Sequence, residues 1–352
     1  MKKHITAIKK VIIFTILTAA LTLGILGGCS KKEAPKAEEP YDIAVFIPGV
    51  VAGSPIYEML VAGAEQAAAE YEQAGIKVVE GGFNQAEWEE KMTGLAASGD
   101  YDLILTSNPA MPFVCREVAE SFPEQKFLNL DAYLADHPQI HTVLYNQVEQ
   151  AYMVGYLGGL ITTGDLPGAN PELKVGLIAA QQYPALDKMM RPGFERGLHD
   201  VDAAIEVDFR VIGNWYDAGK AADLAHSMFD AGVDVILTIA GGANQGVINA
   251  AQERGKYVLY FDANGYAIAP GTILGCAVLR QDRLTYERVK MAVEGGLEFG
   301  VAQVVHAREG YVDFVDDDPL YTEHVPEEIR VRMDAALNAL RKGELTLEVP
   351  SF

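Results

Sequence analysis

The chain has 352 residues and a formal net charge of −21, with 49% hydrophobic and 22% charged residues. This length favours about two domains, and the composition is typical of a globular protein with enough apolar material for buried cores. The negative charge would repel phosphate backbones and no basic stripe interrupts it, which excludes a nucleic-acid partner.

Residues 1–28 have the pattern of an export signal, because the basic start MKKHITAIKK precedes the apolar run VIIFTILTAALTLGILGG. A transmembrane anchor is the alternative, since this run is close to the ~20 residues that span a bilayer. The sequence Leu26-Gly27-Gly28-Cys29 resembles a bacterial lipobox, which favours cleavage and lipidation of Cys29. Residues 29–40 are polar and charged and contain proline, so we expect a flexible tether there.

From residue 41 the sequence alternates short β-branched runs with longer amphipathic segments. Strands are predicted at 42–50, 76–82, 101–107, 126–132 and 141–146, with helices at 56–75, 86–99, 112–122 and 148–164. Residues 165–172, DLPGANPE, break this pattern. It then restarts with strands at 174–180, 204–212, 233–240, 256–262 and 272–279, helices at 185–200, 217–231, 243–254, 283–297 and 326–345, and a strand pair within 301–316. The alternation predicts parallel sheets covered by helices, and the break predicts two α/β lobes.

Catalytic motifs are not evident in the sequence, and we predict that the protein is not an enzyme. The turn GGANQG (241–246) follows a strand but matches neither the dinucleotide-binding nor the P-loop motif. His137 and His141 are four residues apart, but Pro138 makes a shared helical face improbable, so we predict no metal site. Cys115 and Cys276 lie among apolar neighbours and are expected to be buried free thiols.

Aromatic and amide side chains follow the predicted strands. In parallel sheets ligands bind beyond the carboxyl ends of the strands, and such side chains suit a flat, polar-edged, largely uncharged ligand. The candidate ligand-binding residues are Tyr57, Asn84, Trp88, Asn108, Tyr183, Trp215, Tyr216 and Asn244. A purely structural role is the alternative for each of them. In GNWYD (213–217) we expect Gly213 to permit a turn, Trp215 to stack on the ligand and Tyr216 to pack behind it.

Several stretches, taken together and in order, resemble the basic membrane protein (BMP) family of ABC-transporter substrate-binding lipoproteins, which are relatives of the purine nucleoside receptor. The stretches are FPEQKFLNLDA (122–132), YNQVEQAYMVGYLGGL (145–160), RPGFERG (191–197), NWYDAGKA (214–221), AGGANQGVINAAQERG (240–255) and YFDAN (260–264). The resemblance implies a type I periplasmic binding fold, in which two Rossmann-like lobes are joined by a three-strand hinge and close on ligand. It places one lobe at 41–165 plus 283–310 and the other at 172–282 plus 311–349.

The same resemblance implies a monomeric, exported body, lipid-anchored to a bacterial membrane in the periplasm or at the cell surface, with an ABC permease as partner and no cofactor. In nucleoside-binding members an aspartate and a lysine hold the ribose hydroxyls. The matching residues here are Asp262 and Arg280, so the lysine is replaced.

The first loop departs from the nucleoside-binding pattern, because PGVVAGSPIYEM carries Tyr57 where an Asn would stand. Together with Trp88 it looks like the riboflavin-binding branch of the family. Gly49, Ala52 and Gly53 could leave room for the dimethylbenzene edge of an isoalloxazine ring. Riboflavin is therefore the expected cargo, with a purine nucleoside as the alternative.

Overall fold

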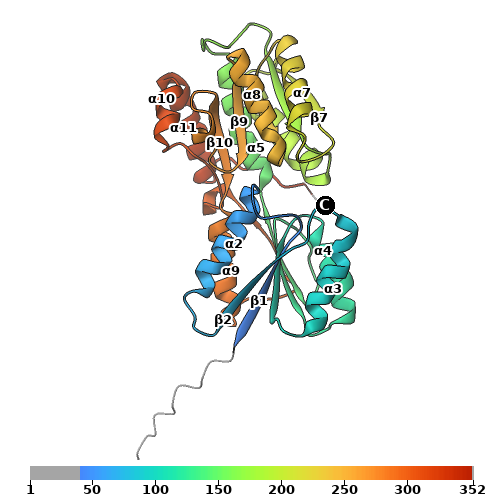
Figure 1. Ribbon diagram of the computed structural model, residues 1–352. Coiled ribbons are helices and arrows are strands. Elements are labelled where there is room, and N and C mark those ends of the chain that lie inside the picture. The colour runs from blue at the N-terminus through green and yellow to red at the C-terminus, as the bar shows by residue number, and fades with distance from the viewer. Residues whose placement is uncertain (1–39, 351–352) are drawn as a thin grey trace, which may run out of the picture. The chain divides into compact units, whose positions relative to one another are not determined.

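The computed structural model describes residues 40–350 (Figure 1). The predicted signal peptide at 1–28, the lipidation site Cys29 and nearly all of the predicted tether lie outside the described residues. Within 40–350, no helix combines the length and apolar character needed to cross a membrane.

Two sheets organise the described residues, and each belongs to one lobe (Figure 1). The first sheet is entirely parallel and has the order β11-β5-β4-β3-β1-β2. Its strands are β1 (Tyr41–Ile47), β2 (Ala74–Glu80), β3 (Leu103–Ser107), β4 (Lys126–Leu130), β5 (Ile140–Tyr145) and β11 (Ala302–Val305). The central strands read as continuous apolar runs, as expected for strands that are covered on both faces.

The second sheet repeats this arrangement with the order β12-β10-β9-β8-β6-β7. Its strands are β6 (Lys174–Ala179), β7 (Glu206–Val211), β8 (Val233–Ile239), β9 (Tyr257–Asp262), β10 (Ile273–Leu279) and β12 (Val312–Phe314). All pairs are parallel except that of β12 with β10. The structure thus confirms two α/β lobes built on mainly parallel sheets.

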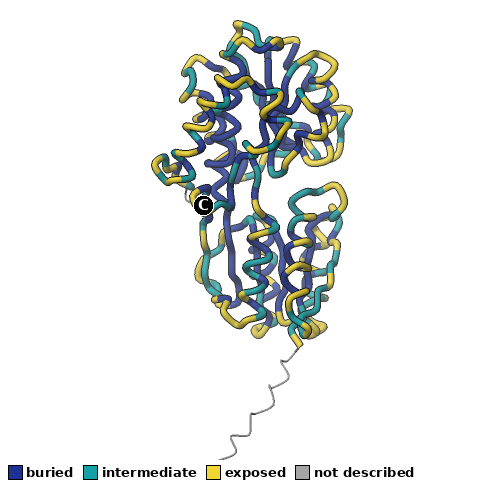
Figure 2. Tube along the Cα trace, turned by 90° about the vertical axis from the view of Figure 1, so that its left-hand side faces the viewer, coloured by how far each residue is buried: buried dark blue, intermediate teal, exposed yellow. Residues whose placement is uncertain are grey.

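The helices divide between the two sheets. The first lobe carries α2 (Pro55–Ala68), α3 (Trp88–Ser98), α4 (Met111–Ser121) and α9 (Gln281–Val293), and the second lobe carries α5 (Gln147–Thr162), α6 (Arg191–Val201), α7 (Ala218–Asp230), α8 (Asn244–Arg254), α10 (Pro319–His324) and α11 (Glu327–Arg341). A π-helical turn, Leu186–Met190, precedes α6. In Figure 2 buried residues follow the strands in the interior, whereas exposed residues lie mainly at the outer loops.

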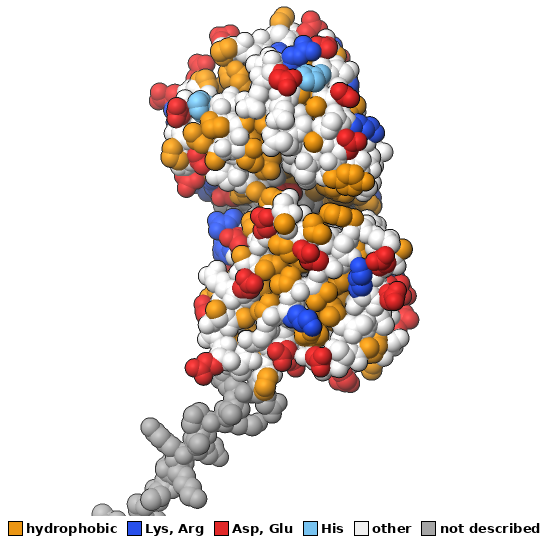
Figure 3. All heavy atoms as spheres, viewed as in Figure 1, with side chains coloured by type: hydrophobic (Ala, Val, Ile, Leu, Met, Phe, Trp, Pro, Cys, Tyr) orange, Lys and Arg blue, Asp and Glu red, His pale blue; other side chains and the backbone are white. Residues whose placement is uncertain are grey.

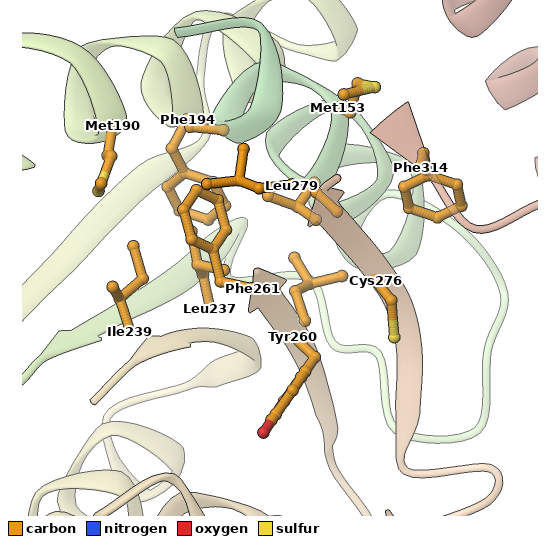
Figure 4. Packing of buried hydrophobic residues seen from close by; sticks show 14 of the residues in the cluster. Met153, Met190, Phe194, Leu237, Ile239, Tyr260, Phe261, Cys276, Leu279 and Phe314 are labelled. Carbon is orange, nitrogen blue, oxygen red and sulfur yellow. The ribbon is translucent and has the colours of Figure 1, made fainter. Parts of the chain in front are cut away.

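Helix α5 lies on the second sheet, although its residues precede the chain break and fall within the range expected for the first lobe. It packs against α6, β10 and β12. Close approach of α5 and α6 requires glycine, because a Cβ at Gly155 would lie 2.2 Å from the carbonyl oxygen of Phe194. The core beside these helices is formed by side chains such as Phe194, Leu237 and Phe261 (Figure 4).

Three connections join the lobes: from β5 to α5 at Asn146, from β10 to α9 at Arg280, and from β11 to β12. They are hydrogen-bonded to one another. Asn146 N donates to Val305 O at 2.9 Å, and Arg280 N donates to Tyr311 O at 2.8 Å. The buried Tyr145 hydroxyl donates to Gln281 Oε1 at 2.6 Å.

Two smaller expectations have opposite outcomes. Both strands predicted within 301–316 are present, but their expected pairing with each other is wrong, because β11 pairs with β5 in the first sheet and β12 pairs with β10 in the second. The short segment between them, which includes Ala307–Glu309, crosses from one lobe to the other. Cys115 and Cys276 are confirmed as buried free thiols.

Candidate functional site

Two aspartates occupy matching positions in the two lobes. Asp131 directly follows β4 and Asp262 ends β9, and these strands hold the same place in their sheets. Both backbones are left-handed, with φ of 54° at Asp131 and 71° at Asp262, a conformation that residues other than glycine seldom adopt. The two carboxyls therefore stand at the carboxyl ends of the strands, where ligands bind in parallel α/β sheets.

Both carboxyls are electrostatically perturbed. Burial raises the pKa of Asp131 well above its usual range, and the nearby charge of Asp262 raises it further. Burial raises the pKa of Asp262 to about 6, although a hydrogen bond from Gln150 opposes that shift. Gln150 Nε2 donates to Asp262 Oδ1 at 3.0 Å and to Ala277 O at 3.3 Å.

The remaining acceptors at this place are short of donors. Within residues 40–350, Asp131 Oδ1 and Gln150 Oε1 have no hydrogen-bond partner. Buried acceptors without partners are costly, so donors supplied by a ligand would be favourable here. Asp131 was missed by the sequence reasoning. Its signal was its place directly after a buried strand, as for Asp262 in YFDAN.

Tyr57 and Asn108 lie beside Asp131 in the first lobe. The Tyr57 hydroxyl donates to Pro48 O at 3.3 Å and lies 3.5 Å from Asn108 Nδ2. Burial raises the pKa of Tyr57 to about 12, the Asn108 contact lowers it, and the charge of Asp131 raises it. The structure thus brings these two predicted residues together with Asp131.

Tyr183 and Trp215 form an aromatic pair in the second lobe. Their ring centroids are 6.0 Å apart and their planes are tilted by 44°. Burial raises the pKa of Tyr183, and the charges of Asp262, Asp131 and Asp187 raise it further. The Tyr183 hydroxyl itself donates to Met190 Sδ at 3.5 Å. Because both aspartates influence Tyr183, we assign the aromatic pair to the same candidate site. Figure 3 shows hydrophobic side chains on both sides of the indentation between the lobes.

Trp88 and Asn84 serve the local structure of the first lobe. Trp88 is 5% exposed, packs in the core with Phe46 and Met92, and donates from Nε1 to Gly82 O at 2.8 Å. Asn84 donates to Glu87 Oε1 at 2.7 Å at the start of a short helical turn. Neither is brought to the aspartates by a described contact.

In the second lobe, three further candidates also have other partners. Tyr216 is 71% exposed, so the expectation that it packs behind Trp215 is wrong. Asn244 Oδ1 accepts from Thr238 Oγ1 at 2.7 Å and from Ala240 N at 2.9 Å, which closes the turn after β8. The half-exposed Arg280 side chain lies 3.4 Å from Asp282 Oδ1.

Groups of His, Cys, Asp or Glu that could hold a metal ion are absent from residues 40–350. What the described site offers is three aromatic rings, two carboxyls and several amides. Such a set can hold a planar ring by stacking and accept hydrogen bonds from hydroxyl or amine groups.

The sequence of this chain matches the model of the PnrA-like ABC transporter substrate-binding proteins over residues 41–341. It is 24% identical over 305 residues to an uncharacterised lipoprotein of Pyrococcus horikoshii, covering 82% of this chain and 72% of that one. It is 27% identical over 161 residues to a CD4+ T-cell-stimulating antigen of Listeria monocytogenes, covering 46% and 43%. A protein of Lactococcus lactis named ABC transporter nucleoside-binding protein is 26% identical over 134 residues, covering 38% and 36%. The chain thus spans less than half the length of the latter two relatives.

Solved structures confirm the predicted type I periplasmic binding fold. A solute-binding protein of an ABC transporter system from Aeropyrum pernix superposes with a TM-score of 0.74 at 22% identity, covering 89% of this chain and 94% of that one. A solute-binding protein from Conexibacter woesei gives a TM-score of 0.65 at 18% identity, covering 88% and 99%.

Proposed function

Because this chain belongs to the family of PnrA-like ABC transporter substrate-binding proteins, we propose that its cargo is riboflavin, bound between the two lobes. The observation that carries the proposal is that the charge of the buried Asp131 acts on both Tyr57 and Tyr183, that Asp262 also acts on Tyr183, and that the Tyr183 ring lies against Trp215. An isoalloxazine ring offers large flat faces for the aromatic side chains. A ribityl chain offers several hydroxyl donors for the carboxyls and for the unpartnered amide oxygen of Gln150.

The first loop supports a wide ring. A Cβ at Gly49 would lie 3.2 Å from Tyr57 Cε2, so the lack of a side chain at Gly49 leaves room for the tyrosine ring. A Cβ at Gly53 would meet nothing within 4 Å, which is compatible with space beside the loop. We assign this space to the dimethylbenzene edge of the ring.

Phosphorylated forms fit the site less well. Arg280, which was expected to hold cargo hydroxyls, lies near Asp282, and the other residue expected to hold them is the carboxylic acid Asp262. Two carboxyls would repel a phosphate group. Flavin mononucleotide should therefore bind more weakly than riboflavin.

A purine nucleoside is the second candidate. The printed name of the Lactococcus lactis relative specifies nucleoside binding, and Asp262 matches the aspartate that such members use for ribose. A nucleoside also presents a flat ring and vicinal hydroxyls, so the same residues would serve it.

We propose that the protein acts as the lipid-anchored receptor of an importer. Cys29 would carry the lipid, the polar stretch before β1 would tether the body, and a permease would receive the cargo from the closed lobes. No chemical change of the cargo is part of this proposal.

Calorimetric titration with riboflavin, flavin mononucleotide and inosine tests the proposal. We expect riboflavin to bind, flavin mononucleotide to bind at least tenfold more weakly, and purified protein to show a flavin absorbance band. Tighter binding of inosine would replace riboflavin by the nucleoside. A preference for the phosphorylated flavin would instead favour a cofactor-dependent enzyme that uses the GGANQG turn.

A further inference from the structure

Phe83 is a large, exposed aromatic side chain just after β2. It lies in the turn GGFN (81–84) and is 63% exposed. Strand β1 runs toward the second lobe in Figure 1, and β2 is parallel to it, so Phe83 stands at the edge of the first sheet that faces the second lobe. A single exposed aromatic needs no special explanation, so its surroundings decide whether it has a role.

The turn that carries Phe83 is held on both sides by hydrogen bonds. Gly82 N donates to Gly49 O at 2.9 Å, which joins the turn to the first loop. The carbonyl oxygen of Gly82 accepts from Trp88 Nε1 at 2.8 Å, and the Trp88 ring is buried in the core. Gly82 has φ of 70°, a conformation that glycine adopts without strain. Phe83 is therefore presented by an ordered backbone, which lowers the entropy that a contact with a ligand would cost.

The ring of Phe83 lies beside that of Tyr57. A Cβ at Gly49 would lie 3.9 Å from Phe83 Cε1 and 3.2 Å from Tyr57 Cε2, so both rings border the same point of the first loop. The Tyr57 hydroxyl in turn lies 3.5 Å from Asn108 Nδ2. Because β2 is the edge strand of its sheet, Phe83 extends the row of Asn108 and Tyr57 to the outer edge of the first lobe.

The two ends of this row differ in chemistry. Strand β4, which Asp131 follows, lies three strands along the sheet from β2, or roughly 14 Å at the usual strand spacing. A carboxyl therefore stands near the middle of the sheet and an apolar ring near its edge. A ligand that reaches both must be long, with hydroxyl groups toward one end and an apolar edge at the other. Riboflavin has this form, whereas the purine ring of a nucleoside lacks the apolar edge.

We propose that Phe83 forms the outer wall of the cargo site and contacts the dimethylbenzene edge of the isoalloxazine ring, with Trp88 as the residue that positions its turn. The inference rests on the proposed function. It assigns the preference for a methylated ring edge to one side chain of the first lobe, while the carboxyls serve the hydroxyl groups of the cargo.

Calorimetric titration with riboflavin and with didemethylriboflavin, the analogue that lacks both ring methyl groups, tests the contact. The wild type should bind riboflavin about tenfold more tightly than the analogue, because it buries the methyl groups. Phe83→Ala should weaken riboflavin binding about tenfold and bring the ratio of the two affinities close to one, whereas Phe83→Tyr should keep the ratio. Val331→Ala removes a 61% exposed side chain from α11 and should change neither affinity.

Trp88→Phe keeps an aromatic ring in the core but removes the donor to Gly82 O. It should reduce the preference for the methylated ring about threefold while far-ultraviolet circular dichroism stays that of the wild type. The full preference in this variant would overturn the positioning role of Trp88. A wild type without the preference, or Phe83→Ala with the preference intact, would overturn the contact of Phe83 while riboflavin remains the cargo. A wild type that binds neither flavin would instead refute the proposed cargo, and this inference with it.

Discussion

The rings of Tyr183 and Trp215 contact each other with centroids 6.0 Å apart and planes tilted by 44°. Trp215 Nε1 also donates to Gln181 Oε1 at 3.3 Å, and the ring packs partly against the core of the second lobe. The indole is thus oriented before cargo arrives, which reduces the entropy that stacking on a ligand would cost.

Replacing this indole should weaken cargo binding strongly. We expect Trp215→Ala to lower riboflavin affinity by about 2–4 kcal/mol, or roughly 30- to 800-fold, as for other aromatic hot spots. The neighbouring Tyr216→Ala is the matched control and should change affinity less than about threefold, because Tyr216 is 71% exposed. Calorimetric titration measures both. Unchanged affinity with a large fall in the apo melting temperature would identify Trp215 as a packing residue.

Asp262 should make the stability of the cargo-free protein depend on pH. The folded protein holds this proton up to a pKa of about 6, whereas the unfolded chain releases it near 3.8. The folded state therefore binds more protons between these values, and the contribution of Asp262 to stability falls as the pH rises from about 4 through about 6. Asp262→Asn should flatten this part of the melting-temperature profile measured by scanning calorimetry. Identical slopes for variant and wild type would contradict the assignment.

The contact between α5 and α6 should not tolerate even one methyl group. A Cβ at Gly155 would lie 2.2 Å from Phe194 O, so the backbones must separate. We expect Gly155→Ala to lower the free energy of unfolding by about 1–3 kcal/mol in urea titrations. Gly94→Ala in α3 is the control, because a Cβ there meets nothing within 4 Å and should raise stability by about 0.5–1 kcal/mol. A stable Gly155→Ala variant would mean that the two helices pack less closely than described.

The hydrogen bond between Tyr145 and Gln281 should stabilise the hinge. It is buried, 2.6 Å long, and connects β5 to α9 across two of the lobe connections. Tyr145→Phe leaves Gln281 Oε1 without its donor and should cost about 1–3 kcal/mol. Tyr71→Phe removes a similar bond to Glu294 on the surface and should leave the unfolding midpoint unchanged. Equal midpoints for both variants would show that the buried bond adds nothing.

The proposed lipid anchor is attached to Cys29, which precedes the described residues. Cys29→Ala should prevent lipidation and move the protein from the membrane fraction to the soluble fraction, with riboflavin affinity unchanged. Fractionation of cells followed by titration of the released protein measures both effects. Continued membrane association of a correctly cleaved variant would refute the lipoprotein assignment.

The strands were predictable from sequence because buried parallel strands are continuous apolar runs, as in LILTS and VDVILTI. The lobe that receives α5 was harder to assign. Nearly every side chain of this helix is buried, so it has no polar face to show which side meets a sheet. Strands β11 and β12 were expected to pair with each other, because two short apolar runs close in sequence suggest a hairpin. In the structure the chain instead changes lobes between them.

Within the site, position at the end of a strand was a useful signal but not a sufficient one. Asp262 is the last residue of β9 and was among the predicted site residues, and the same signal would have identified Asp131, which directly follows β4. Trp88 and Asn244 also follow predicted strands, but their partners are local backbone or core atoms. Only tertiary contacts distinguish an indole that fills a core from one that borders a ligand.

Strand β11, at Ala302–Val305, completes the first sheet beside β5, although most of the second lobe, from α5 to β10, is encoded between them. During synthesis the first lobe therefore cannot complete its fold until α9 and β11 have emerged. Until then the edge of β5 is unpaired and α2 is uncovered. Exposed strand edges of this kind invite pairing with other chains. The two lobes must therefore mature together, and a truncated product ending near residue 165 should aggregate rather than persist as a stable half of the protein.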